Sequence, residues 1–281
     1  MIHALGYSGG KDSTALYLWM LEQREAGGPD FLANFCDTGW EHDVTYDYLW
    51  TVMAPHMEAH GVRLNVLRSA KYDGFADLCV KRGRVPSAMR RFCTQELKIF
   101  PLHAWIESQD DDVTTYQGVR AQESARRARM CEQEFVNDAG GYWIRRPIFR
   151  WTHDEVFEIH RRHGIPYNPL YLMGMGRVGC APCIMVNLRE FKTLLQCSPE
   201  IIVKLRELEA AVEDKHGNAR SFFASDTIPE RFHSRVYVNK DGQEFSVCTV
   251  DDVANYVLAV DEDQLPLWET PKCVSVYNLC E

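Results

Sequence analysis

Short apolar runs alternate with amphipathic stretches along the first half of the chain. Apolar runs of strand length cover residues 2–7, 31–36, 62–67 and 113–119, and helical patterns cover 14–26, 44–60, 72–81 and 94–108. A further helix is expected from about residue 122. Because strands that alternate with helices across short loops form parallel sheets, the pattern predicts an α/β fold with a mostly parallel, doubly wound sheet. In such sheets ligands bind at the carboxyl ends of the strands.

The pattern changes after Pro147. Thr152 and Glu155 form the sequence of a capping box, before a helix that should end near Gly164. Residues 199–215 have the periodicity of an amphipathic helix, and the turn sequence at 239–242 indicates a hairpin. We therefore expect a sheet domain over residues 1–170 and a smaller, mainly helical, cysteine-containing region over residues 171–281.

Composition narrows the class of protein. The chain has 281 residues, a formal net charge of −9 and 46% hydrophobic residues, enough for a substantial core. No apolar run reaches the length of a membrane span and no secretory signal is present, so we expect a soluble, cytoplasmic protein without membrane contact. The negative charge argues against unspecific adhesion to nucleic acid. Residues 81–98 nevertheless carry six Lys or Arg against Glu96 alone, which favours a local polyanion such as a nucleotide, or else a solvated basic face.

A glycine turn follows the first apolar run directly. It is the segment Ser8-Gly9-Gly10-Lys11-Asp12-Ser13, and the first helical stretch comes next. Glycines let backbone N–H groups approach an anion, and the helix N-terminus adds partial positive charge. Lys11 supplies a full cation, and the two serines supply hydroxyl donors. The turn therefore predicts a phosphate site, although its spacing is neither that of a Walker A loop nor that of a dinucleotide fold.

Four segments in order resemble the phosphoadenosine phosphosulfate (PAPS) reductase family of the adenine nucleotide α-hydrolase-like superfamily. They are residues 8–13, 91–98, 118–127 and 147–183. The first segment is also similar to the PP-loop of ATP pyrophosphatases, which cleave ATP between its α and β phosphates. The resemblance covers roughly residues 2 to 190.

The resemblance implies roles for individual residues. The loop from Ser8 to Ser13 would hold phosphates, with Lys11 and Asp12 close to the chemistry. Asp37 and Thr38 would lie near the adenosine, and Arg91 and Lys98 would bind an anionic group. Arg120 would reach the phosphates, and Gly118 would allow a close backbone approach. Glu123 and Ser124 would lie at the start of the next helix as further contacts to the nucleotide. Glu123 fits equally well as a first-turn acid that the helix dipole favours.

Ten cysteines in a chain expected to be cytoplasmic favour metal or redox chemistry over disulfides. The pair Cys180 and Cys183, two residues apart in a glycine-rich turn, is the strongest metal signal. Together with Cys93, the pair resembles the cysteines that hold a [4Fe–4S] cluster in adenylylsulfate reductases, although Phe92 replaces one of them. Candidate further ligands are Cys197, Cys273 and Cys280. An open three-cysteine iron site, a structural zinc and a pair without metal stay open as alternatives.

The intact loop, including Lys11, favours ATP with Mg²⁺ over a sulfonucleotide. We therefore expect an enzyme that adenylates an acceptor and releases pyrophosphate, as part of sulfur transfer from a donor protein. DNA phosphorothioation ATPases and tRNA thiolation enzymes have similar chemistry, so nucleic acid is one candidate acceptor. One alternative is a thiol-dependent sulfonucleotide reductase, with Cys280 as its catalytic nucleophile. Another is a nucleotide-binding accessory protein without turnover.

Overall fold

A computed structural model describes residues 1–212, 220–238, 241–261 and 265. Its central sheet has six strands in the order β3-β2-β1-β4-β6-β5. All neighbours are parallel except β5 and β6, which pair antiparallel at one edge. The strands are β1 (Ile2–Tyr7), β2 (Leu32–Cys36), β3 (Leu64–Leu67), β4 (Val113–Tyr116), β5 (Gln133–Val136) and β6 (Tyr142–Arg145). The predicted mostly parallel α/β sheet is confirmed.

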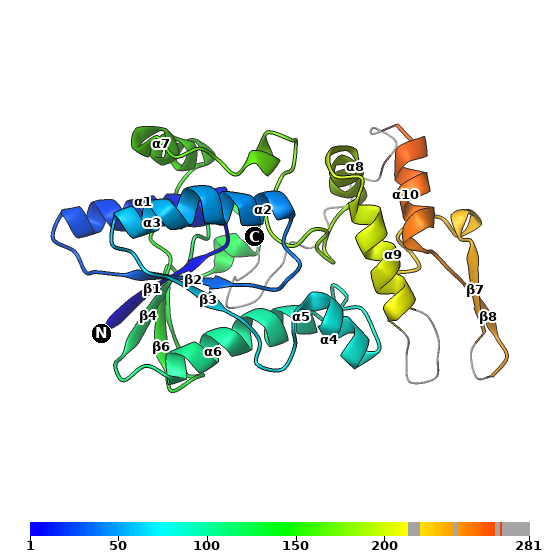
Figure 1. Ribbon diagram of the computed structural model, residues 1–281, viewed down its shortest axis with the longest axis horizontal. Helices are drawn as coiled ribbons and strands as arrows, with labels where there is room; N and C mark the ends of the chain where they lie inside the picture. Colours follow the sequence, from blue (N-terminus) through cyan, green and yellow to red (C-terminus); the bar gives the residue numbers. More distant parts are fainter. Residues whose placement is uncertain (213–219, 239–240, 262–264, 266–281) are drawn as a thin grey trace.

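Helices cover both faces of this sheet (Figure 1). One face carries α1 (Lys11–Glu25), α2 (Asp43–Tyr48), α3 (Ala54–Ala59) and α7 (His153–His163). The other carries α4 (Phe75–Arg82), α5 (Phe92–Thr94) and α6 (Phe100–Glu107). Single π-helical turns at Leu49–Met53 and Gln95–Ile99 join α2 to α3 and α5 to α6. Because helices cover both faces, every residue of β2 is buried.

The prediction of a helix from about residue 122 is wrong. Two short 3₁₀ turns, Ala121–Glu123 and Arg127–Arg129, occupy that segment, and the β5–β6 hairpin follows. The Glu123 carboxylate accepts from the backbone N–H of Arg120 at 2.7 Å, and the Ser124 hydroxyl accepts from the N–H of Arg127 at 3.1 Å. Such side-chain bonds to the backbone compete with helix propagation and end each turn after three residues.

The second half of the chain contains the expected capped helix and the expected hairpin. Thr152 caps α7 together with Glu155, and Gly164 ends that helix in a left-handed conformation. The 3₁₀ turns Pro169–Tyr171 and Glu230–Phe232 accompany α8 (Leu188–Cys197), α9 (Ile201–Ala211) and α10 (Val250–Ala259). β7 (Arg235–Val238) pairs antiparallel with β8 (Glu244–Val247). Among the described residues, no helix has both the length and the apolarity to span a bilayer.

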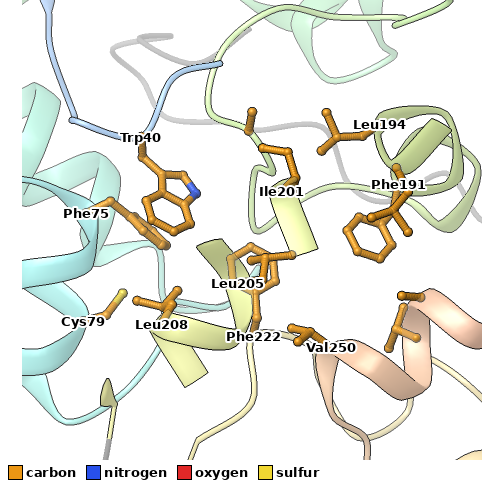
Figure 2. Close-up of a cluster of buried hydrophobic side chains, with 14 of the residues drawn as sticks. Trp40, Phe75, Cys79, Phe191, Leu194, Ile201, Leu205, Leu208, Phe222 and Val250 are labelled. Atoms are coloured by element: carbon orange, nitrogen blue, oxygen red, sulfur yellow. The ribbon is translucent and has the colours of Figure 1, made fainter. Parts of the chain in front are cut away.

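One buried cluster joins the sheet domain to the C-terminal helices (Figure 2). Phe75 and Cys79 on α4 pack with Leu205 and Leu208 on α9, beside Trp40. Phe191 on α8 and Val250 on α10 belong to the same cluster. The division expected near residue 170 stays a prediction, but this shared core fixes the C-terminal helices against the strand ends.

Candidate functional site

The loop between β1 and α1 has the geometry of an anion cradle. Gly9 has a φ of +82°, which side-chain-bearing residues rarely adopt, and Gly10 is the N-cap of α1. The Ser13 hydroxyl donates to the carbonyl of Gly10 at 3.0 Å and lies 3.0 Å from the Ser8 hydroxyl. The serines thus brace the turn, and the N-terminus of α1 directs its partial positive charge at the loop.

Two cations meet at one buried carboxylate beside this loop. Asp12 is 1% exposed, and its two oxygens lie 3.1 Å from Lys11 Nζ and 2.5 Å from Arg120 Nε. Arg120 is itself only 4% exposed. Since a buried carboxylate orients both cations, they are held in place before any ligand arrives. The catalytic roles expected of Lys11, Asp12 and Arg120 stay a prediction.

Gly118, which follows β4, lies directly against the start of α1. A Cβ on this residue would lie 2.8 Å from the carbonyl oxygen of Asp12 and 2.9 Å from the backbone N of Ser13. Because only a residue without a side chain fits here, Gly118 lets the two strand-end segments touch. The expected close backbone approach is therefore directed at α1 in this structure.

Three residues that the sequence reasoning assigned no role also hold the loop. Tyr171 Oη accepts from the N–H of Lys11 at 3.1 Å, and Asn168 Nδ2 donates to the carbonyl of Gly9 at 3.3 Å. His160 Nε2 donates to the carbonyl of Lys11 at 2.9 Å, and burial lowers the pKa of its imidazole. All three belong to the segment 147–171 that carries the family resemblance, which was the available signal.

A second cluster of polar groups lies at the end of β2. Asp37 accepts hydrogen bonds from Tyr46, from the N–H of Gly39 and from Arg68. Burial alone would raise the pKa of Asp37, but these hydrogen bonds and the charge of Arg68 hold it below its usual value. Thr38 donates to the carboxylate of Glu41 at 2.8 Å. Asp37 and Thr38 thus carry structural contacts here, and their expected contact with adenosine stays a prediction.

Glu41 is the functional candidate that sequence reasoning missed. Its carboxylate is 3% exposed, yet it lines the same cleft as the phosphate loop and lies 4.0 Å from the Cys180 sulfur. Lys204 lies with its Nζ 4.1 Å from the centre of the Trp40 ring, and burial lowers the pKa of this lysine. No motif marks Glu41 or Lys204, since the chain folding alone brings both beside Cys180.

Three of the predicted metal-binding cysteines line one pocket. Cys93, from α5, and Cys180 and Cys183, from the loop before α8, lie around it with Arg91 and Lys98. The Cys183 sulfur accepts a hydrogen bond from the backbone N–H of Met185 at 3.5 Å. The donor chemistry fits an iron–sulfur cluster or zinc. Within the described ranges, however, no three His, Cys, Asp or Glu side chains are close enough to form a metal-binding group.

Of the remaining cysteine candidates, Cys197 is described by the structure and does not line this pocket. Cys197 donates to the carbonyl of Thr193 at 2.9 Å within its own helix, α8. Cys273 and Cys280 lie outside the described residues. Of the six candidate cysteines, three thus line one pocket, but in the described part of the chain they do not form a metal-binding group.

The cysteine pocket and the phosphate loop belong to one cleft. Its lining includes Ser8, Ser13, Gly118, Lys98 and Cys180, and it encloses about 760 Å³, part of it open to solvent. Glu123 and Ser124 cap and pair within their own turns, with Glu123 ion-paired to Arg127, and their expected ligand roles stay a prediction.

A strand-end cleft and a glycine loop with cations beside it define an α/β protein with the PP-loop fold. Comparison with known proteins then identifies the family. The family described as "Phosphoadenosine phosphosulfate reductase domain" matches residues 2–186. The chain belongs to this family, as its motifs predicted.

Individual relatives show how far the similarity extends. A 37.8 kDa protein of Escherichia phage 186, described as uncharacterized, is 32% identical over an alignment that covers 100% of this chain and 97% of the relative. An adenosine 5'-phosphosulfate reductase of Allochromatium vinosum is 36% identical over 40% of this chain and 39% of the reductase. The similarity to the named reductases is therefore confined to part of each protein.

Solved structures show more distant likeness. The PAPS reductase of Candida auris has a TM-score of 0.49 at 16% identity, over 65% of this chain and 83% of that chain. The U34-tRNA thiolase of Methanococcus maripaludis, solved with its [4Fe–4S] cluster, has a TM-score of 0.45 at 14% identity, over 100% of this chain and 80% of that chain. At this level neither likeness bears on the reaction of this protein.

Proposed function

We propose that this protein binds Mg²⁺–ATP and adenylates an acceptor, with release of pyrophosphate. The observation that carries the proposal is the complete loop, in which Gly9, Gly10 and the N-terminus of α1 form an anion cradle beside Lys11 and Arg120. A sulfonucleotide has no β or γ phosphate beyond its α phosphate, whereas ATP carries a chain of three phosphates. A cradle with two cations held in place suits that larger charge.

The reaction needs little beyond charge stabilisation. An acceptor oxygen attacks the α phosphorus, the bond between the α phosphorus and its bridging oxygen breaks, and pyrophosphate leaves with Mg²⁺ while the acceptor proton passes to solvent. Lys11 and Arg120 would neutralise charge that develops on the phosphates. Asp12, which contacts both cations, would act as a positioning residue.

Sulfur transfer would follow adenylation. A hydrosulfide supplied by a donor protein attacks the activated carbon of the acceptor, a C–S bond forms, and the C–O bond to AMP breaks. Cys93, Cys180 and Cys183 would hold a [4Fe–4S] cluster or zinc, with Cys273 or Cys280 as the further ligand, and such a cluster would supply a place for sulfide. Glu41 and Lys204 lie beside Cys180 and would set the charge around its sulfur.

Anaerobic calorimetry with Mg²⁺–ATP, adenylylsulfate and PAPS in parallel tests the first step. ATP should bind at least about tenfold more tightly than either sulfonucleotide, which corresponds to about 1.4 kcal/mol. Lys11→Ala should weaken ATP binding by about 10- to 100-fold, because a hydrogen bond to a charged group contributes about 1.5–3 kcal/mol. Arg161→Ala, an exposed cation on α7, is the control. Tighter binding of a sulfonucleotide would refute the proposal.

The local similarity to adenosine 5'-phosphosulfate reductases supports a second candidate, a thiol-dependent sulfonucleotide reductase. This activity would release sulfite and an adenosine phosphate, and Cys280 would be its nucleophile. Sulfite release that Cys280→Ser abolishes would establish the reductase. Absence of sulfite with both adenylylsulfate and PAPS, in the presence of a thiol reductant, would exclude it.

A further inference from the structure

A basic surface on α4 and on the loop after it is not explained by nucleotide binding. We call it the α4 surface and define it by its cations, which are Lys71, Lys81, Arg82, Arg84 and Arg90. All five cations are exposed. The surface lies on the sheet face opposite α7 (Figure 1). Its cations are therefore accessible to solvent. They belong to a different part of the chain from His160, Asn168 and Tyr171, which hold the phosphate loop.

Aromatic rings organise these cations. Lys71, Lys81 and Arg82 lie over the Tyr72 ring at 5.2, 5.8 and 6.0 Å from its centre. Arg82 and Arg84 lie over the Phe92 ring at 5.9 and 5.2 Å. A guanidinium that stacks on an aromatic ring can still donate from its edge to a ligand, and it loses less freedom on binding. Arg82 already donates to Tyr72 and Glu96, so this argument applies to Arg84.

The charge of the α4 surface is only partly compensated. Asp77 pairs with Lys81 at 2.8 Å and Glu96 pairs with Arg82, while Asp73 also acts on the charge of Lys81. No ion pair links Lys71, Arg84 or Arg90 to a carboxylate in the part of the chain that the structure describes. On a chain of net charge −9, this surplus is a local feature that favours a polyanion.

The α4 surface adjoins the mouth of the cysteine pocket. Arg82 and Arg84 lie over the ring of Phe92. Its two neighbours in the sequence, Arg91 and Cys93, both line that pocket. Phe75, at the start of α4, lines it as well. A ligand that binds along the cations would therefore extend toward the cleft in which adenylation is proposed.

From this arrangement we infer that the α4 surface binds the phosphate backbone of a nucleic-acid strand. Guanidinium forks match phosphate oxygens, and contacts of this kind position a strand without reading its sequence. A protein partner fits less well, because interface cores are depleted in lysine and this surface contains two. That the bound strand is the acceptor rests on the proposed function, whereas its binding does not.

Fluorescence anisotropy with labelled single-stranded RNA and DNA of about 16 nucleotides tests the inference. It is performed without ATP at several salt concentrations between about 50 and 200 mM. The triple variant Lys71→Ala/Arg84→Ala/Arg90→Ala removes cations without a described carboxylate partner. Its affinity should fall about tenfold or more, and the slope of log K against log salt should become shallower by about 2, at about 0.7 per lost phosphate contact.

The control triple variant Arg150→Ala/Arg161→Ala/Arg206→Ala removes the same charge from other surfaces, where each arginine is exposed and paired with an acid. It should keep the affinity of the unmodified protein. Absence of binding at the lowest salt, or an equal loss in both triples, would overturn the inference. Poly-glutamate that binds the α4 surface more tightly than either oligonucleotide would overturn it in favour of an acidic protein.

Pyrophosphate release from ATP is measured separately, so the two ideas can fail independently. Oligonucleotide binding that depends on the α4 surface, in a protein that neither binds nor cleaves ATP, would leave the surface established and refute the proposed function. Selective ATP binding without any oligonucleotide binding would do the reverse.

Discussion

Replacing Gly118 by alanine tests whether the contact between β4 and α1 holds the phosphate loop. The new Cβ would lie 2.8 Å from the carbonyl oxygen of Asp12, and 2.9 Å from both the carbonyl carbon of Asp12 and the backbone N of Ser13. These are backbone atoms in the first turn of α1, so no rotamer change relieves the clash. Since carbon contacts are optimal at about 3.5–4.0 Å, the two segments must separate by roughly 0.5–1 Å.

This separation has a cost for stability and a cost for binding. Overpacking of this kind costs about 1–3 kcal/mol, and each kcal/mol lowers Tm by about 2–4 °C in a domain of this size class. A shift of about 1 Å at a positioned group lowers activity by up to about 100-fold. We therefore expect a Tm several degrees lower, and ATP affinity reduced about tenfold or more because the N–H groups of α1 move away from the phosphates.

Thermal unfolding and calorimetry with Mg²⁺–ATP measure the two effects. Gly176→Ala is the matched control, because its Cβ would meet only the Glu190 carboxylate at 3.5 Å, an ordinary contact with the end of a side chain. Its unfolding free energy should stay within about 0.5 kcal/mol of the unmodified protein. If Gly118→Ala leaves both Tm and ATP affinity unchanged, the close contact does not shape the loop and the reasoning is refuted.

Three further predictions concern charge and metal. Asp12→Ala should lower the free energy of unfolding by about 3–5 kcal/mol, because it leaves the buried Arg120 and the partly buried Lys11 without their carboxylate. Asp251→Ala, at an exposed pair, should cost at most about 1 kcal/mol; equal losses in denaturant titrations would contradict this. The lowered pKa of Asp37 predicts a contribution to stability that is present above pH 3.8 and lost as the pH falls below it. Asp37→Asn should therefore flatten the acid side of a plot of unfolding free energy against pH. An unchanged plot would exclude the effect. Anaerobically purified protein should contain iron and sulfide, or zinc. The double variant Cys180→Ser/Cys183→Ser should lose this metal, whereas the control Cys131→Ser, at an exposed cysteine, should retain it. Metal content that is independent of the cysteine pair would exclude this site.

Local sequence patterns predicted the sheet, the phosphate loop and the family. Alternating apolar and amphipathic stretches identify strands and helices because burial on two faces leaves a periodic signature. The helix expected from about residue 122 failed for a local reason as well. The side chains of Glu123 and Ser124 bond to the backbone and stop propagation, and a periodicity argument weighs such bonds too little.

The sequence by itself determined the form of the glycine loop between β1 and α1, because its glycines and its lysine are contiguous and their geometry is local. Only the tertiary structure decided which distant groups join them. Glu41 and Lys204 lie beside Cys180, and Tyr171 and His160 hold the loop from another segment. These contacts depend on how the crossover helices and the shared buried cluster bring strand ends together, and no spacing along the chain encodes that long-range packing.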